Sequence, residues 1–190
     1  MEIRTRDQAP RNPRGAGHGR APRTVAALAL GLGILVDGGC RTPGLAPPPT
    51  TPIRVTDAAD RGDPARRASV RLVVEGLDAD AMRAWRSAEG SYQRAIQVDP
   101  TNPYVYLALA RHHLDAGDPA RAQNLIDQAA ALFEAESMVS PQVQVHLIGL
   151  RGWALEGRGL PDDASLYLDR AARLAPQVWG DGYLSAGELR

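Results

Sequence analysis

The sequence predicts an all-α fold. Alanine is abundant and runs of β-branched residues, which favour strands, are scarce. Between residues 65 and 178, amphipathic stretches end at pairs such as Asp99-Pro100, because proline cannot continue a helix. Asn102-Pro103 and Asp118-Pro119 each join a capping residue to a proline at the tolerated first position of the next helix. These patterns indicate short helices joined by tight turns.

Residues 1–39 are typical of a secretory signal peptide. A leader with six arginines precedes the apolar run Thr24–Val36, and small residues follow it. The run has 13 residues, fewer than the about 20 that span a bilayer. Gly38-Gly39-Cys40, which contains the only cysteine, resembles the lipobox of bacterial lipoproteins, although Asp37 stands where that family usually has an aliphatic residue. The resemblance implies lipidation of Cys40. A soluble secreted protein, an uncleaved anchor and a chance apolar stretch are the alternatives.

Residues 40–64 predict an extended linker. Six prolines fall in this segment and apolar residues show no periodicity. Proline-rich segments extend by about 3.1 Å per residue, so the linker could hold a domain roughly 70 Å from a membrane anchor. We therefore expect a disordered N-terminal region followed by a folded domain at residues 65–178.

Three segments of 34 residues share one spacing of small and large residues: 69–102, 103–136 and 145–178. Residues 103–136 show it most clearly, with Gly117 at the turn between two helices. In residues 69–102, Arg83 stands where the turn glycine belongs, and the alternative is a turn after Gly76 with Asp78 or Asp80 capping the second helix.

The third segment is displaced by the eight residues Ser137–Gln144. We expect the preceding helix to continue through Phe133 and Ser140 to cap the next one, ahead of Pro141.

This spacing resembles the tetratricopeptide repeat (TPR), a motif of two antiparallel helices. The resemblance implies three helix-turn-helix repeats stacked as a short right-handed solenoid. Three is about the minimum for stability, since each repeat buries its face only against its neighbours. Residues 179–190 would then form a C-terminal tail, or a cap over the last repeat.

No pattern in the sequence predicts catalysis. His112 and His113 are adjacent on a helix, so their side chains diverge and cannot chelate one metal ion, and His146 has no partner at metal-ligand spacing. No nucleophile elbow, phosphate loop or dinucleotide fingerprint is present. Residues 41–190 hold 16 Arg against 19 acidic residues, a net charge of −3 that disfavours nucleic acid. We expect no catalytic residue, metal site, cofactor or small-molecule substrate.

The resemblance instead implies a binding groove, lined in TPR proteins by the first helix of each repeat. The register assigns to it Val73, Leu77, Tyr104, Leu107, Arg111, His146, Gly149 and Trp153. Trp153, Tyr104 and Arg111 are the expected hot spots, since Trp, Tyr and Arg dominate interface energetics. Tyr104 and Leu107 could equally pack between repeats. The Lys/Asn clamp of chaperone-binding TPR proteins is absent, which argues against capture of an acidic C-terminus.

The sequence therefore predicts a non-catalytic scaffold that binds a protein or peptide of the bacterial envelope and is tethered to the membrane through Cys40. Arg41, rather than Asp, follows the cysteine, which by resemblance to Gram-negative lipoproteins implies the outer membrane, facing the periplasm. The alternatives are a structural subunit or assembly factor of a larger complex (secretion, pilus or outer-membrane assembly), a soluble periplasmic or secreted protein and, less favoured, a cell-wall enzyme.

Overall fold

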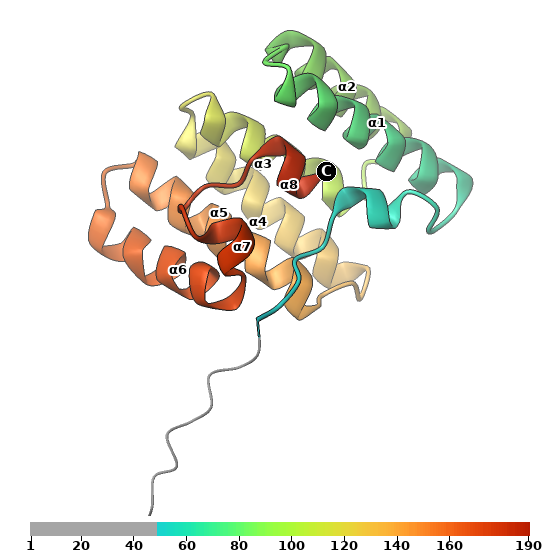
Figure 1. Ribbon diagram of the computed structural model, residues 1–190. Helices are drawn as coiled ribbons and strands as arrows, with labels where there is room; N and C mark the ends of the chain where they lie inside the picture. The colour runs from blue at the N-terminus through green and yellow to red at the C-terminus, as the bar shows by residue number, and fades with distance from the viewer. Residues whose placement is uncertain (1–48) are drawn as a thin grey trace, which may run out of the picture. The chain divides into compact units, whose positions relative to one another are not determined.

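The computed structural model describes residues 49–190, and all regular structure in that range is helical. Long helices pack in successive pairs, α1 with α2, α3 with α4 and α5 with α6 (Figure 1). The elements are η1 (Val55–Ala58), α1 (Pro64–Ala81), α2 (Trp85–Val98), α3 (Pro103–Asp115), α4 (Pro119–Ala135), α5 (Pro141–Gly157), α6 (Pro161–Leu174), α7 (Pro176–Trp179) and α8 (Ala186–Leu189). The predicted all-α fold of three repeats is confirmed. The expected signal peptide and Cys40 lie outside the described residues.

Proline and a capping side chain start four of the six long helices, α1, α3, α4 and α5. α3 begins at Pro103, and the buried side chain of Asn102 accepts a hydrogen bond from the Tyr104 amide, 3.1 Å away. α5 begins in the same way, with Ser140 accepting from the Val143 amide. The caps satisfy amides that have no partner within the helix, which fixes where each repeat begins.

The first turn lies at Arg83 rather than after Gly76. Arg83 takes a left-handed backbone (φ 56°), the conformation for which glycine is preferred. Gly76 instead lies inside α1, where a Cβ atom would come within 2.3 Å of the Tyr92 ring. Its missing side chain lets α1 and α2 approach closely. Because α1 continues to Ala81, Asp78 and Asp80 lie inside this helix and do not cap the second one.

The third pair is displaced as expected. α4 continues through Phe133, which is fully buried, and ends at Ala135. Ser137 has φ 54° and turns the chain toward the start of α5.

The two terminal segments pack on the repeats. Part of the expected linker is folded, because residues 50–58 pack on the repeats and Val55 of η1 is fully buried. The expected tail or cap, residues 179–190, begins on the last repeat, where Trp179 packs against Gly149 of α5. It crosses α5 and α3 and ends beside α1 (Figure 1). Both segments lie on the face built by the first helix of each pair, which we call the inner face.

Candidate functional site

The predicted groove residues lie on the first helix of each pair, and most of them are buried; Tyr104 packs edge to face on Phe133 of α4, at 5.3 Å between ring centroids. The register places Val73 and Leu77 on α1, Tyr104, Leu107 and Arg111 on α3, and His146, Gly149 and Trp153 on α5. All are buried except Trp153, which is half-buried. The register thus identifies residues of the first helices, but it does not show that other parts of the same chain bury most of them.

Trp179 covers the α5 part of the inner face. Its ring lies against Gly149, where a Cβ atom would fall 2.4 Å from two ring atoms, and its centroid is 6.2 Å from that of His146. Leu184 and Leu189, further along the same segment, are also buried. Gly149 is therefore the seat of an internal tryptophan and is closed to a partner in this conformation.

Polar contacts hold both terminal segments in place. The Arg190 guanidinium forms an ion pair with Asp78 of α1, and the Thr56 amide donates to the carbonyl of Arg190 at 3.0 Å. Arg54 donates to the Gly187 carbonyl at 3.0 Å. The N-terminal and C-terminal segments of the folded region are thus hydrogen-bonded to each other on the inner face.

His146 forms a hydrogen bond with the backbone of the N-terminal segment. Its Nε2 lies 2.9 Å from the carbonyl oxygen of Ile53, to which it donates as the neutral imidazole, and Nδ1 has no partner among the described residues. Burial lowers the pKa of His146 to about 4, although the hydrogen bond to Ile53 acts in the opposite direction. The side chain is therefore neutral and structural near pH 7.

A buried cluster of charged side chains, centred on Asp80, links α1 to α3. Asp80 accepts from Arg111 at 2.5 Å, from the Tyr92 hydroxyl at 2.9 Å and from His112 at 2.7 Å. Burial alone would raise the pKa of Asp80, but the hydrogen bond from His112 and the charge of Arg111 more than offset it, so the pKa lies below its usual value. Burial, together with the charge of Asp80, raises the pKa of the Tyr92 phenol. Asp80 is thus an anion with all its partners in place.

Beside this cluster the inner face stays open. A pocket of about 480 Å³ lies where α1 and α3 end, between α5 and the C-terminal segment. We call it the inner pocket. Its walls carry three aromatic rings, four carboxylates and two guanidiniums: Trp85, Trp153 and Tyr183; Asp80, Asp115, Asp181 and Glu188; Arg83 and Arg111.

Of the predicted groove residues, Arg111 and Trp153 line the inner pocket together. Sequence reasoning missed Trp85, which is 37 % exposed at the first position of α2. It also missed Tyr183, whose ring meets that of Trp153 edge to face at 5.3 Å. An aromatic residue in an otherwise glycine-rich tail was the available signal for Tyr183.

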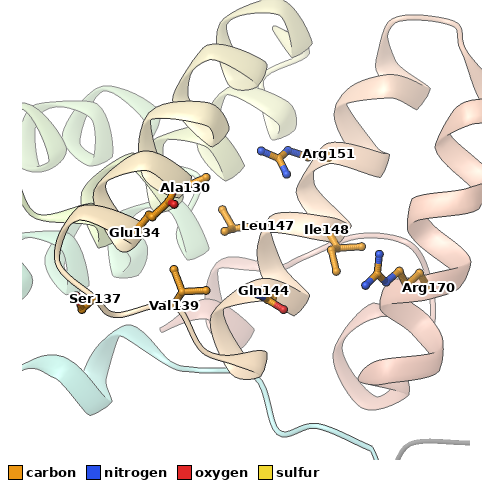
Figure 2. Close-up of a pocket in the computed structure, with 9 residues that line it drawn as sticks. All are labelled: Ala130, Glu134, Ser137, Val139, Gln144, Leu147, Ile148, Arg151 and Arg170. Carbon is orange, nitrogen blue, oxygen red and sulfur yellow. The ribbon is translucent and has the colours of Figure 1, made fainter.

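A second hollow of about 710 Å³ lies on the other side of α5, between α4 and α6 (Figure 2). Figure 2 shows Leu147 and Ile148 forming its floor, with Glu134, Arg151 and Arg170 around them. Ser137, Val139 and Gln144, from the segment that displaces the third pair, also line this hollow. It has no aromatic side chain, and none of the predicted groove residues lines it.

Within residues 49–190, no group of His, Cys, Asp or Glu side chains is arranged to hold a metal ion. None of the helices described combines the length and apolarity that a membrane span requires. His113 is buried, and burial lowers its pKa.

Comparison with known families supports the repeat assignment. Residues 81–139 match the family model of the tetratricopeptide repeat. The match covers α2, the whole second pair (α3 and α4) and the turn toward the third pair. No curated protein and no solved structure matches the chain significantly. The match and the paired helices support a TPR protein, a fold that is typically a non-catalytic interaction module.

Proposed function

We propose that this protein is a non-catalytic scaffold that binds a partner polypeptide at the inner pocket. The observation that carries the proposal is the set of exposed aromatic rings at one opening of an otherwise covered inner face. Trp85 and Tyr183, which both line this pocket, are 37 % and 48 % exposed. Partly exposed Trp and Tyr side chains around a hollow are the usual anchors of protein interfaces.

Site-specific photocrosslinking tests this function. Benzoylphenylalanine placed at Arg83, on the pocket wall, should form an adduct with a discrete partner in intact cells. The same group at Gln93, exposed on α2 and away from the pocket, is the matched control. Trp153→Ala should remove the Arg83 adduct while far-UV circular dichroism stays helical. Equal adducts at both positions, or an adduct that survives Trp153→Ala, would contradict the proposal.

We further propose that Cys40 is lipidated and holds the domain at a bacterial outer membrane, facing the periplasm. The basic leader, the apolar run and Gly38-Gly39 before the cysteine support this localisation. Wild-type protein should incorporate labelled palmitate and fractionate with membranes, and Cys40→Ser should do neither. Absence of label from the wild type would contradict lipidation of Cys40 and leave the soluble, anchored and chance alternatives.

A structural subunit or assembly factor of a larger envelope complex is the second candidate. It is favoured by α6, where Leu166 is 68 % exposed and Tyr167 is 38 % exposed on the last repeat. Leu166→Asp should then release the protein from a large native complex on sucrose gradients. Sedimentation of the wild type as a monomer in cell extracts would exclude this role.

A further inference from the structure

We propose that the inner pocket takes the side chain of an arginine from the partner. This inference rests on the proposed function, because it assigns the arginine to a protein. Its chemistry follows from three features of the pocket: the rings, the carboxylates and the helix ends.

The rings provide the walls that a guanidinium prefers. Trp153 and Tyr183 meet edge to face, at an interplanar angle of 88°, so they present faces in two directions. Trp85 is held similarly by His112, at 5.7 Å between centroids. A guanidinium stacks on indole and phenol faces and is attracted by their electron density. The structure therefore offers pre-oriented aromatic surfaces that no described side chain fills.

The charges of the pocket favour a cation. Four carboxylates against two guanidiniums leave a net charge of −2. Arg111 is already neutralised by Asp80 at 2.5 Å and lies 3.4 Å from Asp115. Asp181 accepts only a backbone hydrogen bond, from the Tyr183 amide, and forms no ion pair with any described residue. Asp181 and Asp115 can therefore pair with an incoming guanidinium, which binds carboxylates through two parallel hydrogen bonds.

The C-terminal ends of two helices add to the negative electrostatic potential of the pocket. α1 ends at Ala81 and α3 at Asp115, and both residues line the pocket. The C-terminal end of a helix carries partial negative charge and stabilises a nearby cation by about 0.3–1 kcal/mol. Two such ends at one hollow disfavour an anionic ligand.

Titration of the ¹⁵N-labelled full chain with N-acetyl-arginine N-methylamide tests the proposal. The chain has three tryptophans, so three indole N–H signals report on it. Those of Trp85 and Trp153 should move on titration, whereas that of Trp179, buried at the other end of the C-terminal segment, should stay. N-acetyl-citrulline N-methylamide, which has the same shape without the charge, should bind at least tenfold more weakly.

Substitution of the carboxylates provides the second arm. Asp115→Asn combined with Asp181→Asn should weaken the arginine probe at least tenfold, and Asp169→Asn, exposed on α6 and outside the pocket, should not. Equal binding of the citrulline and arginine probes would overturn the proposal. So would tighter binding of N-acetyl-glutamate N-methylamide, which would assign the site to anions through Arg83 and Arg111. If the arginine probe does not bind but benzoylphenylalanine at Arg83 forms its adduct, the arginine assignment is wrong and the proposed function stands. If the probe binds but no adduct forms, the proposed binding of a partner polypeptide is wrong.

Discussion

Acidification should destabilise the folded chain through His146, the fully buried imidazole beneath the N-terminal segment. In the folded state burial lowers its pKa to about 4, whereas an unfolded histidine titrates near 6.5. As the pH falls from 6.5 to 4, the unfolded chain binds a proton at this position and the folded chain does not. The unfolded state is therefore favoured progressively across that window.

The size of the effect follows from the gap between the two pKa values. At 1.36 kcal/mol per pKa unit, the gap corresponds to a loss of about 3 kcal/mol in the free energy of unfolding by pH 4. Below pH 4 both states are protonated at His146 and its contribution stays constant. Asp80, whose pKa is lowered, adds its own loss as the pH falls through the ordinary carboxyl range toward the lower pKa of the folded state.

Urea denaturation at pH 7, 6, 5 and 4.5 measures this loss, with the free energy of unfolding extrapolated to water. His146→Gln is the matched variant, because its amide N–H can donate to the Ile53 carbonyl and cannot titrate. Its stability should fall less steeply with pH than that of the wild type, with a difference of about 2–3 kcal/mol accumulated by pH 4.5. Identical pH profiles for the two proteins would refute the argument that His146 is neutral in the fold.

Two further substitutions test the packing around the inner face. Gly149→Ala should drive a methyl group into the Trp179 ring, so it should be less stable than Gly90→Ala, at an open helical position, by about 1–3 kcal/mol, the usual cost of overpacking. The two variants gain the same helix propensity, and equal urea midpoints would show that Trp179 is not seated on α5. Asp80→Asn leaves Arg111 buried without its main counter-ion and should cost about 3–5 kcal/mol by urea denaturation. A loss below about 0.5 kcal/mol, typical of a surface substitution, would mean that the cluster contributes little.

The repeats could be predicted because their signals are local. A cap, a proline and a small residue each act within a few positions, so Asn102-Pro103 and Ser140-Pro141 start helices whatever the rest of the chain does. Arg83 is the informative exception. Its position in the repeat specified a left-handed turn although its residue type did not, and the position prevailed.

The cover of the inner face could not be predicted, because its contacts are distant in sequence and aperiodic. Trp179, Leu184 and Leu189 have neither helical nor strand spacing, and each is buried by residues of other elements. Asp80 raises the same difficulty. As a sequence feature it was a candidate cap, and only the fold brings it to Arg111, 31 residues later. Chemistry that depends on such pairs emerges with the tertiary structure.

The self-covered inner face also determines where a partner can bind at low cost. A peptide in the expected groove at Gly149 would have to expose Trp179, and losing a buried tryptophan typically costs about 3–5 kcal/mol. A peptide at Trp153 and Tyr183 displaces no buried side chain, since these rings already reach the pocket. Tyr183 belongs to the same C-terminal segment that closes the groove. That segment therefore has two roles: it removes most of the repeat groove from use, and it completes the pocket that remains.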